Sequence, residues 1–133
     1  MSTQPKRGSA DVEGRPKFRF MDLDIWRDAV EVGNLVFDVA DELEARRLYR
    51  FAEQLRGAGM SMSNNIAEGA GSDSPREFAQ FLNVARRSVF ENANVILVLE
   101  MRGLVSAQTT SAILWRLESL SRRITGFKKT LRA

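Results

Sequence analysis

Basic side chains gather in the last part of the chain, where they could bind phosphate groups. Residues 106–133 carry six Arg or Lys residues against a single acid, Glu118. This excess is larger than helix capping needs, and cations gathered on one surface bind nucleic-acid phosphates without reading sequence. The candidate nucleic-acid-binding residues are Arg86, Arg87, Arg116, Arg122, Arg123, Lys128, Lys129 and Arg132, joined by the basic residues near the N-terminus. A second interpretation stays open, in which these residues form a solvated helix face that complements the helix dipole.

Aromatic residues are not expected among these charges. We expect no stacking partners interleaved with the basic residues of the last segment. Because sequence-tolerant binding of bases depends on aromatic stacking, the pattern indicates phosphate contacts and no readout of the bases.

A group of polar residues lies upstream, towards the end of the second predicted helix, at Ser61, Ser63, Asn64, Asn65 and Glu68. Buried polar side chains usually satisfy one another by hydrogen bonds. We therefore predict a structural polar network that fixes the register of neighbouring helices. Its predicted members are Ser61, Asn65, Glu68, Ser88 and Glu91. A ligand or phosphate site is the alternative.

The sequence lacks two residue types that are common in enzyme active sites. The chain contains no His and no Cys, so the commonest metal ligand and the commonest acid/base at neutral pH are both missing. Carboxylate pairs such as Glu68 with Glu91 could in principle form a dinuclear metal site, but such sites in bundles normally add Glu-x-x-His motifs. No phosphate-binding loop or nucleophile elbow is present. We predict a non-enzymatic protein without a cofactor.

The elements that carry these residues are predicted to be helices throughout. Residues 1–20 lack periodicity and are rich in Gly, Pro, Ser and charge, which predicts a flexible basic arm. From Met21 onward, apolar residues recur at steps of three and four, which is the helical period. The pattern predicts four helices over about 21–45, 46–69, 75–103 and 106–131, so that residues 21–133 form one domain.

The helix boundaries have local signals. Gly69 and Gly71 are expected to adopt left-handed conformations that end the second helix. Ser74 and Ser106 are expected to cap the next two helices, with Pro75 in the first turn. Small residues around Gly59 predict a close crossing of the second helix with another backbone.

Four amphipathic helices with short connections predict an all-α, antiparallel up-down-up-down four-helix bundle. The first helix has a wide apolar side, and its segment, 21–45, has a net charge of −7, whereas 106–133 has +5. Both features favour burial against a second subunit, so we expect a ring-like homo-oligomer.

No run approaches the roughly 20 apolar residues of a membrane span, and residues 1–20 have no secretory h-region. A cytoplasmic protein without a membrane partner is expected.

Several short motifs resemble a known family. They are Leu23 with Trp26, the run 49–56 (YRFAEQLR), Ser61, the run 65–69 (NIAEG), Glu77-Phe78, Phe81-Leu82, Ala85, Ser88 and Glu91. Together they are similar to the bacterial four-helix-bundle proteins named for intervening sequences in 23S rRNA genes, over about residues 20–130. The resemblance implies a homopentamer, and kinship with the accessory variability protein of diversity-generating retroelements, which binds nucleic acid and a reverse transcriptase. Gly57 stands where the family tends to have Arg, so Arg86 and Arg87 are the expected replacements.

The sequence and the resemblance together predict a non-enzymatic scaffold. We expect a homo-oligomer, a pentamer by resemblance, that binds RNA or DNA through its basic surface. Its expected role is that of an accessory to a reverse transcriptase or another nucleic-acid enzyme. The alternative is a protein–protein adaptor without nucleic-acid binding, in which the acidic first helix and the basic last helix pair between subunits.

Overall fold

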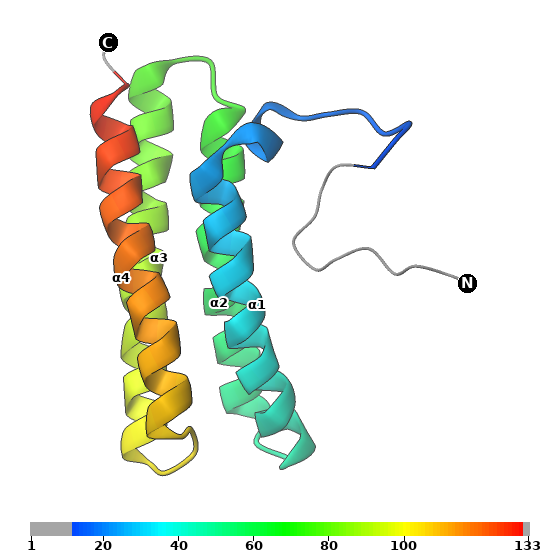
Figure 1. The fold of residues 1–133 in the computed structure, drawn as a ribbon, viewed down its shortest axis with the longest axis vertical. Helices are drawn as coiled ribbons and strands as arrows, with labels where there is room; N and C mark the ends of the chain where they lie inside the picture. The colour runs from blue at the N-terminus through cyan, green and yellow to red at the C-terminus, as the bar shows by residue number, and fades with distance from the viewer. Residues whose placement is uncertain (1–11, 132–133) are drawn as a thin grey trace.

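The computed structural model describes residues 12–131 as four long helices preceded by a short 3-10 helix (Figure 1). The elements are η1 (Arg19–Asp22), α1 (Asp24–Ala45), α2 (Tyr49–Ala70), α3 (Pro75–Met101) and α4 (Ala107–Lys129). The part of the chain that is described has no strand. The prediction of an all-α four-helix bundle is therefore confirmed. Arg132 and residues 1–11 of the predicted arm lie outside the described residues.

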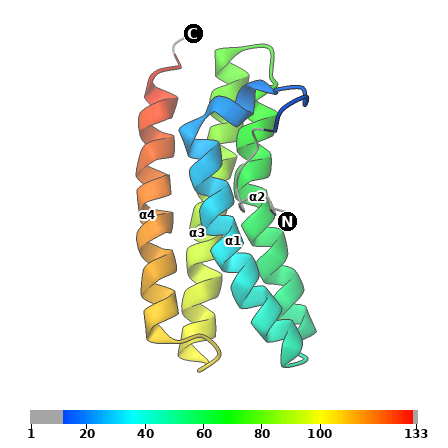
Figure 2. The same cartoon turned by 45° about the vertical axis from the view of Figure 1, so that its right-hand side comes forward.

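Each helix ends close to where the next begins, because the connections are only a few residues long (Figure 1). The packed pairs are α1 with α2, α2 with α3, α3 with α4, and α4 with α1, so the helices surround one core. Figure 2 shows the same four helices from another side, with α1 in front of α2 and α3. The end of the predicted arm packs onto this bundle, since the Phe20 ring lies edge-on to Trp26 at 5.0 Å.

Two serines cap the last two helices. The Ser74 hydroxyl accepts a hydrogen bond from the backbone N–H of Glu77 at 3.1 Å, and Pro75 occupies the first turn of α3. The Ser106 hydroxyl accepts from the N–H of Thr109 at 3.1 Å and starts α4. Both caps satisfy an N–H group that has no partner within its helix. The predicted caps are confirmed.

The prediction of left-handed conformations for Gly69 and Gly71 is wrong. Gly69 lies inside α2, where an added Cβ would sit 2.7 Å from Cβ of Phe81. Gly71 has a φ of −85°, in the right-handed region. The left-handed positions that follow described helices are Arg47, after α1, and Gly103, after α3, and Gly14 before η1 also has a positive φ. Gly69 is thus required by the close approach of α3 rather than by a turn.

The small residues of α2 permit a close crossing with α1, as predicted. A Cβ on Gly33 of α1 would lie 3.1 Å from the carbonyl oxygen of Gly59 in α2. A Cβ on Gly59 would lie 3.0 Å from side-chain atoms of Val36 and Phe37. Glycine at both positions lets the two backbones approach where larger residues would push them apart.

The wide apolar side of the first helix is covered within the chain. Ile25, Val32, Val36 and Val39 are all buried, since α1 packs against η1, α2 and α4. Within the described part of the chain, α1 contributes none of the large exposed apolar side chains. The width of this apolar face therefore does not by itself require a second subunit. The exposed apolar residues of the helices lie instead on α2, α3 and α4.

Candidate nucleic-acid interface

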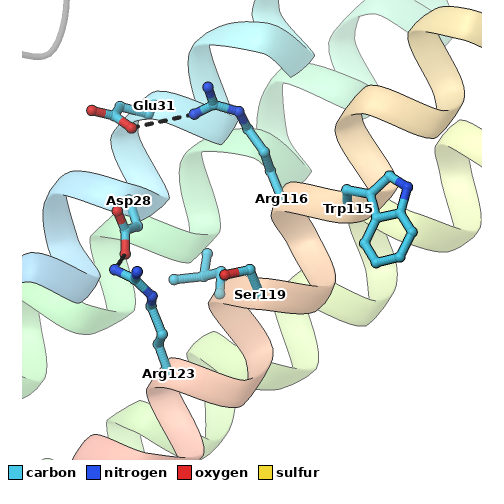
Figure 3. A pocket seen from close by; sticks show the side chains of 7 residues that line it. Asp28, Glu31, Trp115, Arg116, Ser119 and Arg123 are labelled. Atoms are coloured by element: carbon cyan, nitrogen blue, oxygen red, sulfur yellow. Dashed lines mark hydrogen bonds and ion pairs between the residues drawn. The ribbon is translucent and has the colours of Figure 1, made fainter.

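Two of the predicted phosphate-binding residues of α4 are paired with acids of α1. Arg123 donates a hydrogen bond to the Asp28 carboxylate at 2.7 Å, and Arg116 donates to Glu31 at 3.3 Å (Figure 3). The four side chains line a hollow of about 210 Å³. The positive charges of Arg116 and Arg123 are compensated by acids of the same chain. This face therefore presents alternating charges to a polyanion instead of a continuous positive surface.

Trp115 lies beside this face and is 74% exposed. Figure 3 shows its indole pointing away from both ion pairs, although the residue precedes Arg116 in the sequence. The expectation that aromatic residues are absent among the basic residues is therefore wrong on α4. The signal was available in the sequence as the adjacent Trp and Arg.

A groove between α3 and α4 brings three other predicted residues together. Arg86 of α3 and Arg122 and Lys129 of α4 line it, and its volume is about 680 Å³. Its apolar lining comes from Val89, Phe90, Ala93, Leu114 and Leu117. Glu118 is the one carboxylate among its lining residues, and Arg122 donates to it at 2.8 Å within one turn of α4. The groove therefore combines an apolar lining with positively charged residues on both helices.

Arg86 is held against an aromatic ring at this groove. Its guanidinium carbon lies 5.0 Å from the centroid of Phe90, one turn later on α3. Phe90 is 55% exposed, although it is large and apolar. Among residues 12–131, nothing accepts a hydrogen bond from the buried Nε of Arg86. Here too an aromatic residue accompanies the charge, and the i, i+4 spacing of Arg86 and Phe90 could have revealed it.

A second groove between the same two helices adds a cation that the sequence analysis missed. Arg76 and Lys128 line a space of about 400 Å³ together with Gln80 and Asn83. Arg76 follows Pro75 in the first turn of α3. The residues 76, 80, 83 and 87 follow one another at steps of four and three, which places Arg87 on the same side of α3. This spacing along the polar side of α3 could have identified Arg76 as a neighbour of Arg87 from the sequence.

These cations form one surface, which we call the basic face. It consists of the residues Arg76, Arg86, Arg122, Lys128 and Lys129, which line the two grooves, and of Arg87, which helical spacing places on the side of Arg76. Within the described residues, no carboxylate pairs with Arg76, Arg87, Lys128 or Lys129, whereas Arg116 and Arg123 are paired. The structure thus divides the predicted set into two, one part facing the acids of α1 and one part on α3 and the end of α4.

The polar residues of α2 and α3 form a hydrogen-bonded link between these helices. The hydroxyls of Ser61 and Ser88 lie 2.7 Å apart, and the Asn65 amide donates to the carbonyl oxygen of Ser61 at 2.8 Å. Asn92 donates to the carbonyls of Ala58 and Ser88 at 2.7 and 2.8 Å.

The two acidic members of the predicted network lie elsewhere. Glu68 and Glu91 are exposed, and their carboxylates take no part in the side-chain hydrogen bonds found in the described part of the chain. The same region contains no group of three or more acidic side chains placed to hold a metal ion. None of the described helices is long and apolar enough to span a membrane.

The comparison with known families covers most of the bundle. Residues 21–126 match the family described as 23S rRNA-intervening sequence protein. The comparison with curated proteins finds no match. The matched range begins before α1 and ends at residue 126 in α4, so it includes all of α3 but stops before Lys128 and Lys129 of the basic face. On this match, the chain belongs to the 23S rRNA-intervening sequence protein family.

Proposed function

We propose that this protein is a non-enzymatic scaffold that binds RNA or DNA through its basic face. It works in the cytoplasm as an antiparallel bundle assembled into a ring-like homo-oligomer, a pentamer. Its role is to hold nucleic acid for a reverse transcriptase or another nucleic-acid enzyme. The proposal for the partner enzyme is supported by the resemblance to the accessory variability protein of diversity-generating retroelements.

The single observation that supports nucleic-acid binding is the set of unpaired cations on the basic face. Arg76 and Lys128 line one groove between α3 and α4, and Arg86 and Lys129 line the other. Cations without a local carboxylate can release the counterions that surround phosphates, which favours binding. Each cation that is already paired would first have to give up its partner. The basic face is therefore the part of the surface best suited to a polyanion.

Self-association is supported by the second half of α3. Exposed positions in its first half are mainly polar, including Arg76, Gln80 and Arg87, whereas Leu97, Val98 and Met101 are exposed near its end. Met101 is 84% exposed. Exposed apolar side chains grouped on one surface are typical of protein interfaces. This arrangement separates the proposed assembly surface from most of the basic face along one helix.

The test is light scattering combined with RNA binding at low and high salt. Two double variants remove the same charge: Lys128→Gln with Lys129→Gln, and Arg116→Gln with Arg123→Gln as the matched control. The first should weaken binding and reduce the slope of log affinity against log salt by about two. The control variant should change the affinity and the salt slope much less, because Arg116 and Arg123 are paired with acids of α1. Equal effects of the two variants would contradict the proposed surface.

A second candidate function is a protein–protein adaptor, which the apolar lining of the α3–α4 groove favours. An oligomer that binds no RNA or DNA even at low ionic strength would support the adaptor. Binding that falls steeply with added salt would support the scaffold.

A further inference from the structure

The apolar lining of the groove is not explained by contacts to phosphates. Phosphate oxygens interact with cations and N–H donors, and they gain nothing from Phe90, Ala93 or Leu114, the lining residues that are not buried in the core. The groove is nevertheless lined by Arg86 on one helix and by Arg122 and Lys129 on the other. A ligand that fits it must combine negative charge with apolar, flat groups.

Phe90 offers such a ligand a stacking surface. Its ring lines the groove, is 55% exposed, and has the guanidinium of Arg86 at 5.0 Å from its centroid. Nucleobases stack on exposed aromatic rings and on guanidinium planes whatever their identity, because every base has a π-face. Gly126 borders the same groove, and a Cβ there would meet no atom within 4 Å, so the space beside it is open.

Building on the proposed function, we infer that the α3–α4 groove takes unstacked bases of single-stranded nucleic acid, with one base stacked on Phe90. Arg86 and the α4 cations hold the adjoining phosphates. Arg122 and Lys129 are seven residues apart, about 10 Å along the helix, so they contact successive parts of one strand once Arg122 exchanges Glu118 for a phosphate. A duplex keeps its bases paired and stacked inside, and so it contacts the cations but leaves the groove empty. The protein therefore prefers single strands.

A second copy of the same groove is a poorer occupant. Pairing two copies face to face would bring Arg86, Arg122 and Lys129 against their equivalents, and like charges in contact oppose association. The acidic α1 of another copy has no large exposed apolar side chain among the described residues, so it cannot fill the lining. An acidic amphipathic helix of a different protein would fit the groove. A competitor peptide in the binding experiment below distinguishes that occupant from nucleic acid.

The experiment measures fluorescence anisotropy of a short labelled RNA, single-stranded or annealed to its complement, across a salt titration. Phe90→Leu keeps the apolar bulk and removes the aromatic face, and Phe90→Tyr restores it. Trp115→Leu is the matched control, because Trp115 is also exposed but lies beside the paired residues Asp28 and Glu31. Light scattering and thermal unfolding of each variant confirm that assembly and fold are unchanged.

We expect Phe90→Leu to weaken single-strand binding about five- to a hundredfold, the range for loss of one stacked base. The salt slope and the duplex affinity should stay as in the unaltered protein, and Phe90→Tyr and Trp115→Leu should bind normally. Unchanged single-strand binding by Phe90→Leu, or an equal loss for the duplex, would overturn the inference and leave the proposed function standing. Absence of any RNA binding by the unaltered protein would overturn both.

An acidic amphipathic peptide serves as a competitor in the same assay. If Phe90→Leu weakens the peptide's binding and leaves RNA binding unchanged, the groove belongs to a protein partner and the inference fails. If the peptide neither binds nor displaces RNA, the assignment to single-stranded nucleic acid is supported.

Discussion

The guanidinium of Arg123 lies 2.7 Å from the carboxylate of Asp28, and so joins the last helix to the first across 95 residues of sequence. Arg116 and Glu31 join the same two helices a second time. The negative charge of the first helix and the positive charge of the last thus compensate each other partly within one chain. The charge segregation seen in the sequence does not require a second subunit.

The Arg123–Asp28 pair should contribute little to the free energy of unfolding. Both side chains are partly exposed, at 58% for Arg123 and 32% for Asp28, so solvent screens their attraction. A double-mutant cycle with Arg123→Ala and Asp28→Ala should give a coupling of about 0.2–1 kcal/mol. Chemical denaturation at low and high salt measures it, and the coupling should shrink as salt rises. A coupling that salt does not change would contradict this account.

Gly69→Ala should destabilise the bundle, whereas Gly57→Ala should not. A Cβ at Gly69 would lie 2.7 Å from Cβ of Phe81 and 2.8 Å from Cδ1 of Phe78, so α2 and α3 must move apart. Overpacking of this kind costs about 1–3 kcal/mol. At the exposed Gly57, nothing lies within 4 Å, and replacing a helical Gly by Ala gains about 0.5–1 kcal/mol.

Urea unfolding of the two glycine variants measures both effects. Each variant adds one methyl group to the same helix, so their difference isolates the contact with α3. Equal stabilities for the two variants would mean that the helices adjust to Ala at position 69 without cost.

Local features of this protein could be predicted from the sequence because their causes are local. The caps at Ser74 and Ser106 depend on residues within one turn, and the helical period depends on residues three and four apart. Gly69 was misinterpreted because a glycine near a helix end suits a left-handed turn as well as a close approach. Only the position of Phe81 on the next helix distinguishes the two.

The candidate site could be predicted only in part. The basic residues were recognisable by type, but the sequence does not show which of them meet carboxylates. Arg123 is paired with a residue 95 positions away, which depends on how α4 packs beside α1. The link between Ser61 and Ser88 likewise depends on the register of α2 against α3. The contact of Arg86 with Phe90 lies within one turn, and sequence reasoning could have included it.

Asn92→Ala should destabilise the protein more than Asn94→Ala. The Asn92 amide is fully buried and donates to two carbonyls, those of Ala58 and Ser88. Its removal takes away both hydrogen bonds and leaves a cavity between α2 and α3, at a cost of about 1–3 kcal/mol. Asn94 is exposed on the same helix, so its replacement should change stability by less than about 0.5 kcal/mol. Thermal unfolding of both variants is the measurement.

Replacing the exposed apolar side chains at the end of α3 should dissociate the proposed oligomer. Leu97→Gln with Met101→Gln removes apolar surface and keeps residues that favour a helix, so the bundle itself should fold normally. Light scattering should show the mass of a single chain, and RNA affinity should fall because linked subunits bind one strand together. Trp115→Gln is the control, since it removes a large exposed apolar side chain from α4 instead of α3. Dissociation by Trp115→Gln, with no effect of the α3 pair, would place the assembly surface on α4 instead.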